Sequence, residues 1–75
     1  MYIEDKESFV KEFGELLAKY GIEDVKEIRY EKNITDEWDT EEHVIVTFDG
    51  DQHMRVNVHM DSLPAIIRDV MYALR

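Results

Sequence analysis

The first part of the chain has the hydrophobic period of a helix. Between residues 5 and 20, apolar residues recur three or four positions apart, which predicts one amphipathic helix. Gly21 follows directly, where a left-handed C-terminal cap belongs. Gly14 inside the helix costs about 1 kcal/mol relative to Ala, which suggests a close contact with a neighbouring helix or sheet. The apolar stripe consists of Phe9, Val10, Phe13, Leu16, Leu17 and Tyr20.

Three segments of alternating apolar and polar residues follow, and each predicts a strand. Residues 25–32 place Ile28 and Tyr30 on one face, whereas the acidic residues 33–40 predict a loop. Residues 42–48 and 52–60 alternate most regularly. Their inward faces carry Val44, Val46 and Phe48 in one strand, and Met54, Val56, Val58 and Met60 in the other.

The turn between the last two strands determines their register. Asp49-Gly50 is a hairpin signal. Residues directly opposite each other share a face, and both inward sets are even-numbered, so the loop must hold an odd number of residues. A three-residue loop over residues 49–51 places Val46 opposite Met54. A tight two-residue turn would instead require a bulge downstream to restore the phase.

The last element is a second helix. Asp61 or Ser62 can cap its start, and Pro64 is tolerated in its first turn. Its apolar stripe consists of Leu63, Ile66, Ile67, Val70, Met71 and Leu74. The predicted fold is α+β in the order α-β-β-β-α, a three-stranded antiparallel meander with both helices on one face. We expect one domain over residues 1–75.

Charge narrows the choice of partner. The 75 residues carry a formal net charge of −9, and residues 23–48 alone hold nine acids and three bases. The densest stretch, residues 36–42, holds five acids and no base. Such a surface repels phosphates, so we expect no direct binding of nucleic acid and a protein partner with a basic surface instead.

These acids suggest a small protein-binding module. Rows of carboxylates can stand in for phosphates and block a nucleic-acid-binding protein. Small acidic inhibitors from phages and mobile elements, of the anti-CRISPR and anti-restriction type, use this strategy, and the chain is similar to them in size and charge. Trp38 either anchors such a contact or folds back over the core. The predicted partner-binding residues are Asp36, Glu37, Trp38, Asp39, Glu41 and Glu42.

Histidines offer a different hypothesis. The predicted register brings His43, His59 and Glu41 together on the sheet face away from the helices, which would suit a metal site or, with His53, a pH-responsive patch. The same residues also fit an ordinary exposed polar face. No HExxH or Cys/His spacing is present, so we expect no metal and no cofactor, with His43 and His59 as the candidates if one binds.

Other classes of function receive less support. The chain has no cysteine nucleophile and no Gly-rich phosphate loop, and its two serines stand at predicted helix starts, so we expect no enzyme. No targeting segment and no long apolar run are visible, which favours a cytoplasmic protein without membrane contact. The alternative function is a structural homo-oligomer, such as a homodimer, joined through the bare sheet face or the second helix.

Overall fold

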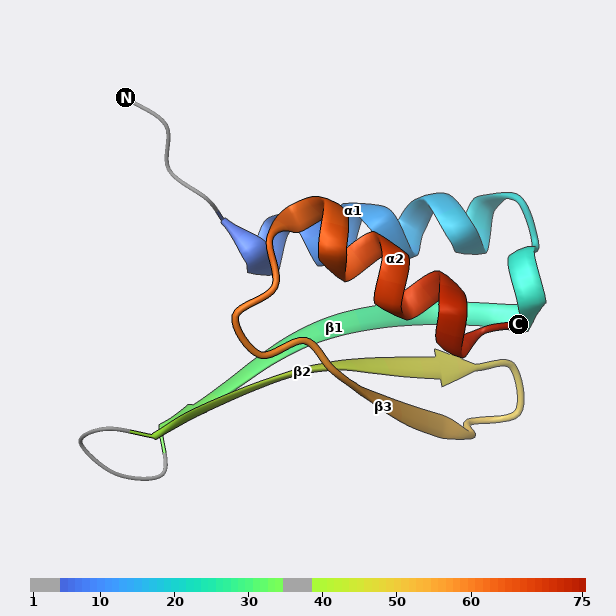
Figure 1. The fold of residues 1–75 in the computed structure, drawn as a ribbon. Helices are drawn as coiled ribbons and strands as arrows, with labels where there is room; N and C mark the ends of the chain where they lie inside the picture. The colour runs from blue at the N-terminus through green and yellow to red at the C-terminus, as the bar shows by residue number, and fades with distance from the viewer. Residues whose placement is uncertain (1–4, 35–38) are drawn as a thin grey trace.

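The computed structural model describes residues 5–34 and 39–75. Two helices and a three-stranded antiparallel sheet follow one another in the predicted order α-β-β-β-α. Both helices cover the same face of the sheet (Figure 1). The elements are α1 (Lys6–Lys19), a short 3-10 turn η1 (Ile22–Asp24), β1 (Val25–Ile34), β2 (Thr40–Phe48), β3 (His53–Asn57) and α2 (Leu63–Ala73).

Local signals at both ends define α1. The Asp5 carboxylate accepts a hydrogen bond from the Ser8 backbone N–H at 3.0 Å and a second from the Ser8 hydroxyl at 2.9 Å. Ser8 is therefore a partner of the cap rather than the cap itself. At the other end Gly21 adopts φ 65°, the predicted left-handed conformation. The apolar stripe is narrower than expected, because Leu16 and Tyr20 are exposed.

The sheet has the order β1-β2-β3, and β2 and β3 pair in the predicted register. Val46 lies opposite Met54, and a hydrogen bond from Phe48 N–H to the Gln52 carbonyl at 2.8 Å closes a turn of three residues, 49–51, between the two strands. The β1–β2 hairpin is longer than predicted. Its strands reach Ile34 and begin again at Thr40, so part of the predicted loop 33–40 is strand.

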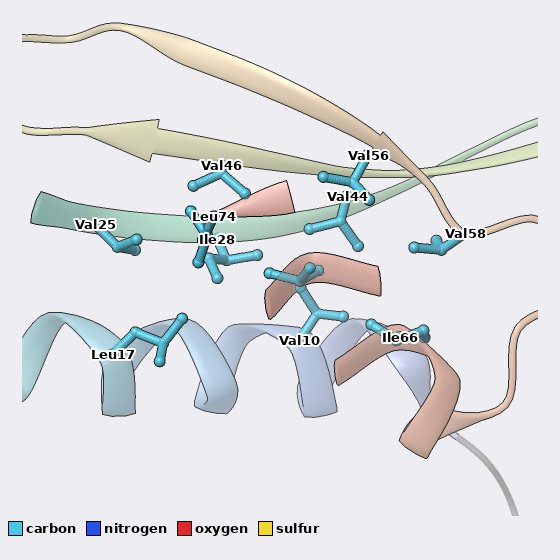
Figure 2. Close-up of a cluster of buried hydrophobic side chains, with 11 residues drawn as sticks. Val10, Leu17, Val25, Ile28, Val44, Val46, Val56, Val58, Ile66 and Leu74 are labelled. Atoms are coloured by element: carbon cyan, nitrogen blue, oxygen red, sulfur yellow. The ribbon is translucent and has the colours of Figure 1, made fainter. Parts of the chain in front are cut away.

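A single apolar cluster fills the space between the helices and the sheet (Figure 2). Gly14 allows α1 to lie directly against β1, because a Cβ atom at this position would be 2.7 Å from the Ile28 backbone nitrogen. This confirms the close contact that the glycine predicted. The buried cluster consists of Val10, Leu17, Val25, Ile28, Val44, Val46, Val56, Val58, Ile66, Val70 and Leu74.

The predicted third strand, residues 52–60, is too long. β3 ends at Asn57, whose side-chain oxygen accepts a hydrogen bond from the His59 backbone N–H at 2.9 Å. Met60 was predicted to face inward but is 82% exposed, because the chain turns there with φ 61° on its way to α2. Ser62, one of the two predicted caps, then caps α2 by accepting a hydrogen bond from the Ala65 N–H at 3.3 Å.

Candidate functional site

The β1–β2 hairpin extends past the end of β3. The last β2–β3 pair is His43 with Asn57, and one further hydrogen bond joins Val58 N–H to the Glu42 carbonyl at 3.0 Å. Beyond Glu42 only β1 and β2 continue, as the pairs Asn33 with Glu41 and Ile34 with Thr40. Figure 1 shows this two-stranded part running away from the helices. We call the segment 33–41 the outer hairpin, of which the structure describes residues 33, 34 and 39–41.

The described part of the outer hairpin is exposed and acidic. Asp39, Glu41 and Asn33 are exposed, and Ile34 is 73% exposed although its position in the alternation matches that of the core residues. Within residues 5–34 and 39–75, no helix covers this end of the sheet (Figure 1). The outer hairpin as a whole contains four acids and no base. Asp36, Glu37 and Trp38, three of the predicted partner-binding residues, lie outside the described residues.

Glu42 stands apart from the other acids because its side chain lies inside the molecule. Only 8% of Glu42 is exposed. Its carboxylate accepts hydrogen bonds from the Lys6 ammonium at 2.8 Å, from the Met60 backbone N–H at 3.0 Å and from the Tyr30 hydroxyl. Glu42 therefore ties the start of α1, β1 and the β3–α2 connection to β2, and it cannot belong to an exposed acidic surface.

The surroundings of Glu42 favour its ionised form. Burial by itself raises the pKa of this carboxyl, but the hydrogen bonds from Lys6, Tyr30 and the Met60 N–H outweigh burial and lower the pKa to about 2. The same contact acts in the opposite direction on Tyr30. Burial and the hydrogen bond to the Glu42 carboxylate raise the pKa of the phenol well above its ordinary value. Glu42 is therefore ionised at neutral pH and forms a partly buried ion pair with Lys6.

The alternation of residues along the strand already indicates that Glu42 faces inward, although the many acids around it in the sequence suggest an exposed position. Glu42 is even-numbered, like Val44 and Val46, so the period of a strand places its side chain on the helix-covered face. Glu41 takes the opposite face and is exposed. Glu41 and Glu42 therefore do not belong to one surface, although both are among the predicted partner-binding residues.

The structure does not bring His43, His59 and Glu41 together. His59 lies beyond the end of β3, and its Nδ1 is 3.9 Å from Glu42 Oε1, on the other side of the sheet from Glu41. His53 lies within 3.3 Å of the Thr47 hydroxyl. Nowhere in residues 5–34 and 39–75 do three His, Cys, Asp or Glu side chains gather as metal ligands would.

Among the described elements, no helix covers the other face of the sheet, which carries mainly polar side chains, as predicted. Arg55 in β3 reaches across β2 to the Glu31 carboxylate of β1 at 3.0 Å. The amide of Asn33, together with Arg55, holds the pKa of Glu31 below its ordinary value. His43 lies between Glu31 and Asn57 in the register, and its Nδ1 is buried without a hydrogen bond to any described residue. Charges on this face are mixed in sign, in contrast to the outer hairpin.

Comparisons with protein families, with curated proteins and with solved structures found nothing that matches this chain. In the part of the chain that the structure describes, neither helix has the length and apolar character to cross a membrane.

Proposed function

We propose that this protein is a small binding module whose outer hairpin engages a basic surface on a protein partner. The observation that supports this proposal is the position of the acids. The outer hairpin has four acids and no base, and its described acids are exposed on a two-stranded extension beyond β3. Acidic groups presented in this way attract a basic surface and favour the encounter of the two proteins.

The proposed partner is a nucleic-acid-binding protein. Its binding groove is basic because it must neutralise phosphates. Carboxylates along a protruding hairpin can occupy such a groove in place of phosphates, and the exposed Ile34 adds an apolar contact next to them. Glu42 is left out of the proposed surface, since its carboxylate is bonded inside the molecule. The proposed contacts are Asp36, Glu37, Trp38, Asp39 and Glu41.

A matched pair of charge variants tests whether position or total charge determines binding. One variant neutralises the outer hairpin with D36N, E37Q, D39N and E41Q. The control neutralises four acids elsewhere with E12Q, E23Q, D49N and D51N, at positions that are all exposed. Both variants change the net charge from −9 to −5. We expect the tagged wild type and the control to capture a basic protein from a bacterial lysate, and the outer-hairpin variant to lose it.

Competition with nucleic acid in the same experiment tests whether the partner is a nucleic-acid-binding protein. Double-stranded DNA or RNA added to the loaded wild type should release the captured protein, because both ligands would occupy one basic groove. Raising the salt concentration should weaken the capture. Equal capture by both variants would contradict the role of the outer hairpin. Capture that nucleic acid does not displace would contradict the mimicry of phosphates and leave a different basic surface as the target.

A further inference from the structure

We propose that the free edge of β1 pairs with the same edge of a second copy of this chain, so that the two sheets become one continuous antiparallel sheet. β1 is the edge strand of the described sheet and is ten residues long. An edge strand presents backbone N–H and C=O groups that have no partner in their own sheet, which makes it a template for pairing with another chain. This surface differs from the bare sheet face and from α2.

An open groove runs along the first half of this edge. Its volume is about 540 Å³, and its β1 side is formed by residues 26–30. Glu7, Lys11 and Glu15 of α1 form the opposite side, because the helical period turns them away from the face that buries Val10 and Leu17. The groove is centred on Ile28, where Gly14 brings α1 nearest to the strand. The first half of the β1 edge is therefore accessible to another strand.

The charges on β1 favour a second copy of the same chain. Glu27 and Arg29 flank Ile28, are exposed, and make no ion pair with any described residue. A two-fold axis at Ile28 places Glu27 of each copy opposite Arg29 of the other, which creates two pairs of opposite charge. Moving the axis by one residue, to Arg29, would place Glu27 opposite Glu31. An axis at Tyr30 would pair Arg29 with Glu31 of the other copy, but Glu31 already accepts a hydrogen bond from Arg55, and that axis would lie at the end of the groove. The charges and the groove together therefore favour the axis at Ile28.

α1 carries a matching pattern above the same axis. A two-fold axis near Gly14 runs the two copies of α1 antiparallel and brings Lys11 of one copy close to Glu15 of the other. Neither side chain makes an ion pair among the described residues. A β-bulge between Val25 and Glu27 interrupts the regular strand, so we expect a short ladder over residues 26–30, the span of the groove.

Sedimentation equilibrium on the full chain, from micromolar to submillimolar concentration, tests the proposal. We expect the wild type to reach twice the 9.0 kDa mass of one chain. R29E places two acids opposite each other on both sides of the two-fold axis and should weaken the dimer at least about tenfold. The swap E27R/R29E restores opposite charges and should restore the dimer. R75E makes the same change of charge beyond the end of α2 and should leave association unchanged.

Crosslinking tests the register independently of whether R29E folds well. The chain has no cysteine, so E27C and R29C each introduce a single thiol. When the two variants are mixed and oxidised, the 27–29 heterodimer should form in preference to the 27–27 and 29–29 homodimers. A wild type that stays monomeric at all concentrations would overturn the proposal. The charges of β1 would then serve to prevent the edge strand from pairing with other chains. A dimer whose affinity R29E leaves unchanged, or that shows no preference for the 27–29 crosslink, would overturn the proposal as well.

Discussion

Glu41 and Glu42 are neighbours in β2, yet the two side chains lie on opposite faces of the sheet in different surroundings. Glu42 is buried under α1 and accepts hydrogen bonds from Lys6, Tyr30 and the Met60 backbone. Glu41 is exposed and belongs to the outer hairpin. The Glu42 carboxylate at the base of the hairpin stabilises the fold, whereas the Glu41 carboxylate is exposed to solvent.

The difference shows that acidic residues close together in sequence do not define one functional surface. In a strand, successive side chains alternate between faces, so a dense acidic run is divided between the interior and the solvent. The extent of β3 and of the helices then decides which residues on the inner face are covered. Ile34 shares its alternation with Val44 and Val46 but is exposed, because the hairpin has passed beyond the helices there.

The largest expected effect is the difference in the free energy of unfolding between the variants E42Q and E41Q. E42Q leaves the Lys6 ammonium without its carboxylate in a mostly buried position, and we expect a loss of about 3 kcal/mol in the free energy of unfolding. E41Q changes an exposed side chain and should cost less than about 0.5 kcal/mol. Urea denaturation of both variants at pH 7 measures the two values. Equal losses would contradict the division of roles between the two residues.

The pH dependence of stability provides a second comparison of similar size. The pKa of Glu42 falls from its ordinary value of 4.5 to about 2 on folding. A lowered folded-state pKa stabilises the protein above the unfolded-state pKa, and this contribution is lost as the pH falls from about 4.5 toward 2. The stability difference between wild type and E42Q should therefore shrink from about 3 kcal/mol at pH 7 to below about 1 kcal/mol at pH 2. A difference that is independent of pH would contradict the ionised state of Glu42.

A substitution at Gly14 tests the packing of α1 on the sheet and changes no residue of the outer hairpin. Replacing a helical Gly by Ala ordinarily stabilises a helix by about 1 kcal/mol. In G14A, however, the new methyl group would lie 2.7 Å from the Ile28 nitrogen and 2.8 Å from its Cβ. We expect a net destabilisation of about 2 kcal/mol from the displacement of α1. Thermal denaturation gives the sign, and a stabilised G14A would contradict the close packing of α1 on β1.

The smallest predicted effect isolates one hydrogen bond at the base of the hairpin. Y30F removes the hydroxyl that donates to Glu42 and should cost about 1.5 kcal/mol, since the acceptor is charged. The matched control, Y20F, removes an exposed hydroxyl from α1 and should cost less than about 0.5 kcal/mol. If chemical denaturation gave equal values for the two variants, the Tyr30–Glu42 contact would have no energetic role.

Local patterns in the sequence predicted the fold well where they agreed with one another. The alternation in β2 and β3 together with the Asp49-Gly50 signal determined the register, and the structure confirms the three-residue loop. Gly21 supplied the left-handed cap of α1, and Gly14 supplied the close approach to β1. In each case one residue type has a conformational or steric property that few others share.

The features that the sequence did not predict depend on contacts between residues far apart in the chain and on where the third strand ends. Met60 continues the alternation of β3, but the chain has to turn there to reach α2, and no local pattern indicates where the turn begins. The role of Glu42 depends on Lys6, which is 36 residues away and meets it only after α1 has packed on the sheet. For the same reason His59 approaches Glu42 rather than His43.

The most direct test of the account is the affinity of the captured basic protein for the two four-site charge variants at equal net charge. We predict that neutralising Asp36, Glu37, Asp39 and Glu41 weakens binding at least about tenfold, whereas neutralising Glu12, Glu23, Asp49 and Asp51 changes it less than about threefold. Titration calorimetry at one salt concentration measures both affinities. Equal weakening in the two variants would contradict the account, because total charge rather than the outer hairpin would then determine binding.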